Sequence, residues 1–199
     1  MSPGAGPVLA STSGATIDLR VDRWRGRCDV VEWGLLAGLP DPVLDVGCGP
    51  GRVAAALVAA GRPALGIDTS PAAVAEARRR GAPVLRRSVF DRVPGGGRWG
   101  AVLLLDGNVG IGGDPVALLA RAAGLLRPGG VVAAEVEPPG RPSEALTVRI
   151  EAPDARPGPW FPWATVGADA IAVVARAAGL ALAALDTGDG RWFARLVAP

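Results

Sequence analysis

The residues best suited to chemistry lie in a glycine-rich turn between a predicted strand and a predicted helix. The strand covers residues 43–46, contains Asp45, and is followed after the turn by an alanine-rich helical run at 53–60. The turn has glycine at alternate positions, namely Gly47, Gly49 and Gly51. Glycine lets backbone N–H groups approach a ligand, and a helix N-terminus adds partial positive charge. The stretch therefore predicts a ligand-binding turn.

The spacing of these glycines indicates which ligand fits. A dinucleotide-binding turn follows the pattern G-x-G-x-x-G, but its sixth position is occupied here by Arg52. Asp45 lies two residues before the first glycine, where a carboxylate would repel a pyrophosphate and attract an amine or hydroxyl. This disfavours NAD and favours a ligand with a cationic amino group and a ribose but no phosphate.

Residues 43–51 resemble motif I of the class I S-adenosylmethionine (SAM) dependent methyltransferases, roughly (L/V)-(D/E)-x-G-x-G-x-G. The resemblance implies an α/β fold: a Rossmann-like doubly wound sheet of about seven strands, mostly parallel with an antiparallel C-terminal strand. It also implies SAM as cofactor and S-adenosylhomocysteine (SAH) as product. The cofactor-binding candidates in this stretch are Asp45, Gly47, Cys48, Gly49 and Gly51. The alternative is a purely structural strand-to-helix turn.

Further cofactor-binding candidates follow the next two predicted strands. Asp68 ends the apolar run 64–67, at about the distance expected between a glycine turn and a ribose-binding acid, and Thr69 follows it. After the third strand, the resemblance implies that Asp91 hydrogen-bonds the adenine amino group and that Phe90 packs on the ring. The alternative for this last pair is a turn acid and a core phenylalanine.

A glycine-rich loop, residues 106–114, follows the fourth predicted strand at 101–105. This strand should lie next to the first, where α/β sheets bind ligands at their carboxyl edge. We therefore expect the loop to face the transferred methyl group. Its candidates are Asp106 and Gly107 for the cofactor, Asn108 for the substrate, and Asp106 and Asp114 as catalytic carboxylates. Asp114 precedes Pro115, so it is equally well explained as a helix cap.

The composition limits the chemistry of this loop. All 21 basic residues are arginine, and the chain has no His, Lys or Tyr. A general base must therefore be a carboxylate, or the acceptor must already be nucleophilic, such as an amine or a thiol.

The segment 138–166 departs from the minimal pattern of the fold. It contains a proline-rich linker, an alternating strand and a cluster with Trp160 and Trp163. An insertion after the fifth strand lies above the carboxyl edge of the sheet, so we expect a substrate lid in which both tryptophans bind the acceptor. The alternative is an aromatic plug over the edge of the core.

The remaining expectations concern organisation. With 199 residues, 49% hydrophobic and 20% charged, we expect a globular domain over residues 17–199 after a disordered tail at 1–16. We predict one helix at 21–36, a helix-to-strand turn at 125–130, and a closing hairpin formed by 181–185 and 192–197.

The predicted function is transfer of a methyl group from SAM to the N, O or S nucleophile of a small-molecule acceptor. A net charge of +2 argues against a nucleic-acid partner, and two cysteines are too few for a metal site or a disulfide framework. No membrane span or signal peptide is predicted, which favours a cytoplasmic protein. The alternatives are an RNA or protein methyltransferase and a SAM-binding, non-catalytic partner subunit. The sequence leaves the oligomeric state open.

Overall fold

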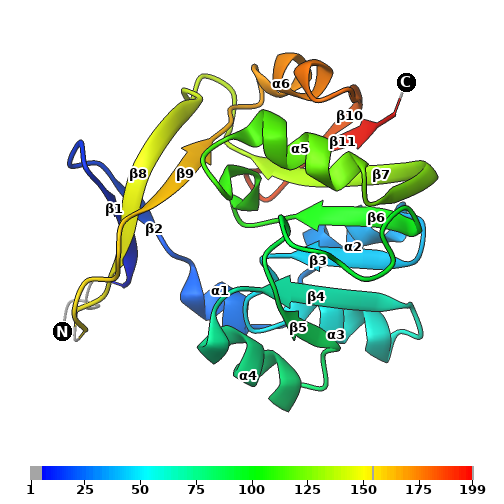
Figure 1. The fold of residues 1–199 in the computed structure, drawn as a ribbon, viewed down its shortest axis with the longest axis horizontal. Helices are drawn as coiled ribbons and strands as arrows, with labels where there is room; N and C mark the ends of the chain where they lie inside the picture. The colour runs from blue at the N-terminus through cyan, green and yellow to red at the C-terminus, as the bar shows by residue number, and fades with distance from the viewer. Residues whose placement is uncertain (1–5, 154, 199) are drawn as a thin grey trace.

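The computed structural model describes residues 6–153 and 155–198, and its main element is a seven-stranded sheet (Figure 1). The strands are β3 (Val43–Val46), β4 (Ala64–Asp68), β5 (Val84–Arg86), β6 (Trp99–Leu104), β7 (Leu126–Val136), β10 (Ala181–Gly188) and β11 (Arg191–Val197). Their order is β10-β11-β7-β6-β3-β4-β5. The five strands from β7 to β5 pair in parallel, and β11 is antiparallel to both of its neighbours. The predicted doubly wound sheet with an antiparallel C-terminal strand is confirmed.

Helices cover both faces of this sheet (Figure 1). They are α2 (Val30–Ala37), α3 (Arg52–Ala59), α4 (Pro71–Arg79), α5 (Pro115–Ala123) and α6 (Ile171–Ala177). Every residue of the central strand β6 is buried. Val102 and Leu104 pack in one core cluster with α5 and α6, whereas Leu103 packs in a second cluster with α2 and α3. The continuous apolar run at 101–105 thus reflects a strand buried on both sides.

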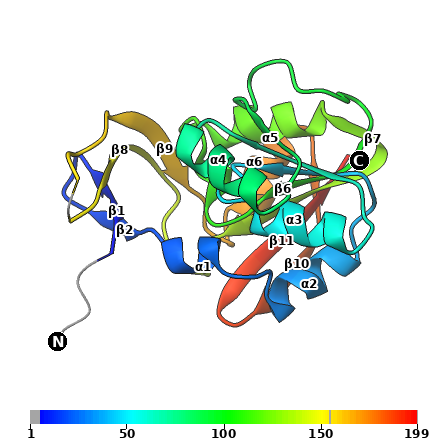
Figure 2. The same ribbon diagram turned by 90° about the horizontal axis from the view of Figure 1, so that it is seen from below.

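A second, four-stranded antiparallel sheet lies beside one end of the larger sheet (Figure 2). Its strands, in spatial order, are β2 (Thr16–Asp18), β1 (Val8–Ser11), β8 (Glu144–Glu151) and β9 (Phe161–Thr165). A parallel bridge between Glu137 and Gly167 joins the end of β7 to the chain that leaves β9. The segment 138–166 therefore supplies half of the second sheet, and the N-terminal segment supplies the other half.

The expectation of a disordered tail at 1–16 is wrong for the part of it that the structure describes. β1 pairs with β8 over the whole of 8–11, and Leu9 is buried. The small residues of this segment gave no local signal, because the strand that orders it is distant in the sequence. Residues 1–5 of the predicted tail lie outside the described residues.

Two predicted boundaries also differ from the structure. The helix expected at 21–36 is two helices, α1 (Val21–Arg25) and α2, because Gly26 ends the first and Asp29 begins the second. Asp29 and Glu32 form a reciprocal capping box there. The turn expected at 125–130 lies mostly within β7, since Leu126 already pairs with Trp99.

A substitution at Gly51 can test how tightly the glycine turn is packed. It has φ +79°, and a Cβ there would lie 2.8 Å from the Cβ of Ala77. Gly61 has a similar φ of +76° but open space around it. Both G51A and G61A should lose roughly 1–2 kcal/mol through the left-handed backbone. G51A should lose about 1–3 kcal/mol more, because α4 must move. Urea unfolding measures both values, and equal losses would contradict this packing.

Candidate active site

The glycine turn is closely packed on two sides and open on the third. All three glycines have positive φ angles. A Cβ on Gly47 would lie 2.6 Å from Nδ2 of Asn108, and one on Gly51 would meet α4, whereas one on Gly49 would meet nothing within 4 Å. The space next to Gly49 is therefore where a ligand can approach the backbone.

Asp68 shapes the turn as well as facing its open side. One carboxylate oxygen accepts the N–H of Gly49 at 2.8 Å, and the other accepts the N–H of Ser70 at 2.8 Å. Each oxygen keeps further acceptor capacity. The neighbouring Thr69 is exposed. Asp68 can thus fix the turn and still accept hydrogen bonds from hydroxyl groups.

The side chains of Asp45 and Cys48 lie in the interior. Asp45 is only 4% exposed, and burial raises its pKa to about 7, against the opposing effect of Arg52. The Cys48 side chain packs closely on Gly66, because a Cβ on Gly66 would lie 2.6 Å from the Cys48 sulfur. Burial, together with the Asp45 charge, raises the thiol pKa. Only the backbone of Cys48 belongs to the open side of the turn.

Phe90 and Asp91 lie at the surface after β5. Phe90 is 49% exposed, and its ring borders Gly112, where a Cβ would approach it to 2.9 Å. The Asp91 carboxylate accepts the N–H of Ser88 at 3.3 Å. This arrangement provides a flat apolar surface with a carboxylate nearby.

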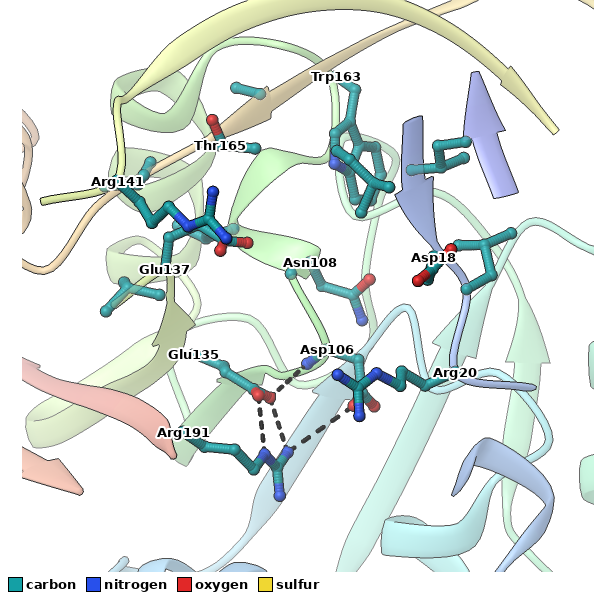
Figure 3. Close-up of a pocket in the computed structure, with 18 of the residues that line it drawn as sticks. Asp18, Arg20, Asp106, Asn108, Glu135, Glu137, Arg141, Trp163, Thr165 and Arg191 are labelled. Carbon is teal, nitrogen blue, oxygen red and sulfur yellow. Dashed lines mark hydrogen bonds and ion pairs between the residues drawn. The ribbon is translucent and has the colours of Figure 1, made fainter. Parts of the chain in front are cut away.

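Asp106 belongs to a closed ring of charges at the carboxyl edge of the sheet. The ring runs through Asp106, Arg52, Glu32, Arg191 and Glu135. One nitrogen of Arg52 lies 2.6 Å from both Asp106 and Glu32. Arg191 lies 3.2 Å from Glu32 and holds both oxygens of Glu135, at 2.8 and 2.7 Å. Glu135 closes the ring by accepting the backbone N–H of Asp106 at 2.7 Å (Figure 3).

Burial is the main cause of the pKa shifts in this ring. It raises the pKa values of Glu32 and Asp106, and Arg52 opposes both shifts. Burial and the Asp106 carboxylate raise the pKa of Glu135 to about 7. The two-point contact with Arg191 favours the ionised form of Glu135.

A cavity of about 630 Å³ lies between the two sheets, next to this ring. Figure 3 shows side chains from both sheets around it. Apolar walls come from β1, β8 and β9, including Leu9, Ile150 and Phe161. The polar side chains of the lining are Asp18, Arg20, Arg23, Asp106, Asn108, Glu135, Glu137, Arg141, Thr165, Asp189 and Arg191. Its volume suits a small molecule.

Asn108 connects the cavity with the glycine turn. Its Nδ2 donates to the carbonyl oxygens of Val46 and Gly47, at 3.0 and 2.9 Å, while the residue lines the cavity. The turn and the cavity are therefore adjacent parts of one site.

Comparison with known proteins bears on the family of the chain. Residues 43–130 match a family model described as a methyltransferase domain. Residues 43–130 thus belong to a methyltransferase domain. This confirms the family that motif I implied. No curated protein sequence matches the chain significantly.

Solved structures support the fold of this methyltransferase. A SAM-dependent methyltransferase from Bacteroides fragilis, in complex with SAH, has a TM-score of 0.78 at 21% identity, covering 98% of this chain and 88% of its own. A Burkholderia thailandensis N1-methyltransferase, with bound 1,6-didemethyltoxoflavin and SAH, has a TM-score of 0.58 at 21% identity, covering 81% and 72%. An O-methyltransferase from neocarzinostatin biosynthesis (NcsB1), in complex with SAH and 1,4-dihydroxy-2-naphthoic acid, has a TM-score of 0.61 at 24% identity, covering 84% of this chain and 53% of its own.

The structure separates the predicted substrate and catalytic candidates of the methyltransferase. Asp106, Asn108 and Trp163 all line the cavity. Trp160 does not: its ring lies under the Arg149 guanidinium, 4.6 Å away. Asp114 is also outside the lining, and its carboxylate caps α5 by accepting the N–H of Ala117 at 2.9 Å. Of the two readings of Asp114, the structure supports the helix cap.

Several further residues of the site were not predicted from the sequence. Glu135 near the end of β7 and Glu137 just beyond it are two residues apart, at a position that the predicted fifth strand could have indicated. Glu32 and Arg191 gave no local signal, because each meets its partners only across the fold. In residues 6–153 and 155–198 no His, Cys, Asp and Glu side chains form a group of three or more that could hold a metal ion. None of the helices in these ranges is long and apolar enough to cross a bilayer.

Asp45 gives a prediction about pH. Its pKa rises from 3.8 to about 7 on folding, so between these values the folded protein holds a proton that the unfolded chain has released. The free energy of unfolding should therefore fall as pH rises through this window and level off above about 7. D45N cannot release this proton, so its decrease should be smaller than that of the wild type. The difference should be at most about 4 kcal/mol, since each pKa unit corresponds to roughly 1.4 kcal/mol.

Denaturant unfolding at pH 4 to 8 measures this difference. E144Q serves as the control, because Glu144 is exposed, and its curve should follow the wild type. If D45N and the wild type lost stability in parallel, Asp45 would not carry the raised pKa.

Proposed function

We propose that this methyltransferase binds SAM at the glycine turn and transfers its methyl group to a small molecule in the cavity between the sheets. The observation that carries the proposal is the position of Asn108, which bonds the carbonyl of Gly47 and lines the cavity. A cofactor on the turn and an acceptor in the cavity would thus meet at the 106–108 loop.

The residues around the turn fit the parts of SAM. The open side of Gly49 admits a ligand, and Asp68 has acceptor capacity for the two ribose hydroxyls. The exposed Phe90 ring and the Asp91 carboxylate suit an adenine and its amino group. Solved structures of the same fold that contain SAM or SAH lend support.

Electrostatics favour a cationic ligand at this place. Besides burial, the charge of Asp106 raises the pKa values of Asp45, Glu32 and Glu135. Arg52 is the main counter-charge of Asp45, Glu32 and Asp106. The amino group and the sulfonium of SAM are both positive, so binding offsets this repulsion. With these positive charges nearby, the Asp45 carboxyl group would ionise more readily.

The chain contributes mainly positioning to the reaction. When bound, SAM would supply an activated methyl group for in-line transfer to a nucleophilic atom of the acceptor. The ring of charges fixes the Asp106–Asn108 loop, and the second sheet covers the cavity and excludes water. Asp106 is held by Arg52 at 2.6 Å, and Asp114 caps a helix, so neither carboxylate is free to act as the expected base.

The proposal includes the expected substrate lid at residues 138–166. β8 and β9 form one wall of the cavity, and Trp163 belongs to its lining. We assign acceptor binding to Trp163. Trp160 is assigned to the outer surface, because its ring stacks with Arg149.

Calorimetric titration of the wild type with SAM, SAH and NAD tests the proposal. SAM and SAH should bind and NAD should not. D68A should bind SAM at least about tenfold more weakly, because charge-assisted hydrogen bonds to the ribose are lost. D186N is the matched control, since Asp186 pairs with Arg195 on the closing hairpin, away from the turn.

Two results would count against the proposal. If neither SAM nor SAH bound, the glycine turn would be structural or would need a partner subunit. If D68A bound SAM as tightly as D186N, the ribose contact would be wrong even if the cofactor were right.

A further inference from the structure

We propose that the methyl acceptor is an amine and that Glu137 holds it in the cavity. This inference rests on the proposed function, and it concerns a residue that motif I does not reach. Glu137 directly follows β7, two residues beyond Glu135, and lines the cavity.

Glu137 differs from the carboxylates of the ring of charges in having no internal partner. Asp106, Glu32 and Glu135 each lie within 2.6–2.7 Å of an arginine nitrogen. The Glu137 side chain is partly buried, yet it makes no ion pair or hydrogen bond with any residue that the structure describes. A carboxylate in such a position gains most from a ligand that donates hydrogen bonds to it.

The surroundings of Glu137 favour an N–H donor on an apolar molecule. The Asn108 amide nitrogen is used by two backbone carbonyls, so its oxygen remains as an acceptor for the cavity. The Trp163 indole provides a flat apolar wall, and Figure 3 draws these side chains around the same hollow.

Nearby cations do not neutralise Glu137 in the structure. Arg141 lines the same cavity, but no ion pair within 4.0 Å joins the two side chains among the described residues, and Arg141 is exposed. Arg20 is also exposed, at the opposite wall. Interactions of exposed arginines with a carboxylate are weakened by solvent, so an amine that enters the cavity can compete with them.

The available bases distinguish an amine from a hydroxyl. The chain has no His, Lys or Tyr, and a carboxylate is too weak a base to deprotonate an alcohol. A bound alkylammonium ion first loses a proton to water, and the neutral amine then attacks with its lone pair: the N–C bond forms, the C–S bond breaks, and the electron pair of the C–S bond stays on sulfur. The product nitrogen then carries one extra proton, which passes through Glu137 to water.

The experiment uses SAH-loaded protein and two probes of the same skeleton, 2-phenylethylamine and 2-phenylethanol. By calorimetry, the amine should bind at least about tenfold more tightly than the alcohol. E137Q keeps the size of the side chain and should lose this preference. R141Q is the matched control and should keep it, because only a competing cation is removed. With SAM in place of SAH, mass spectrometry should detect methylated amine from the wild type.

The outcomes separate this inference from the proposed function. Equal affinity for amine and alcohol, including no measurable binding of either, would overturn the inference, as would an amine preference that survives in E137Q. SAH affinity, measured first on each variant, reports on the cofactor site alone. If E137Q lost SAH binding, its loss of amine would not count, and E137D would replace it, with a weakened but retained amine preference expected.

Discussion

The site depends on the pairing of buried charges around Asp106. Glu32 is fully buried, and Arg52 and Arg191 are nearly so, at 6% and 8% exposure. Charges removed from water in this way are tolerated only when they are paired, and loss of one partner leaves an uncompensated charge that costs about 3–5 kcal/mol. The ring connects α2, α3, the end of β6, β7 and β11, so these five parts of the chain are fixed relative to one another.

The ring also determines the backbone of the loop that faces the acceptor. Asp106 has φ +54°, a left-handed conformation that costs roughly 1–2 kcal/mol for a residue other than glycine. Glu135 offsets this cost by accepting its N–H, and Arg52 holds its carboxylate. Gly107 continues the same conformation at φ +79° and leads directly to Asn108, which supports the glycine turn. Cofactor turn and acceptor cavity are thus aligned by one set of electrostatic contacts.

The sequence was sufficient for features that depend on local chemistry. The glycine turn, Asp68 at the end of β4 and the apolar central strand follow from neighbouring residues, and so does the Rossmann-like sheet. The ring could not be predicted, because Glu32 and Arg191 are 159 positions apart and each is an ordinary charged residue in its own segment. The same limit explains β1, whose partner β8 lies at the other side of the methyltransferase domain in the sequence.

The same contrast between local sequence and contacts across the fold explains which carboxylates at the ligand edge are free to bind a ligand. A carboxylate at the end of a parallel strand is placed at the ligand edge by topology alone, and both Asp106 and Glu137 meet that condition. Whether such a group is free for a ligand depends on whether an arginine from another element reaches it. Arg52 reaches Asp106 from the first turn of α3 and makes it part of the scaffold. Glu137 lies one strand further along the same edge and beyond the ring, so the charge that topology brings to the cavity stays available there for the acceptor.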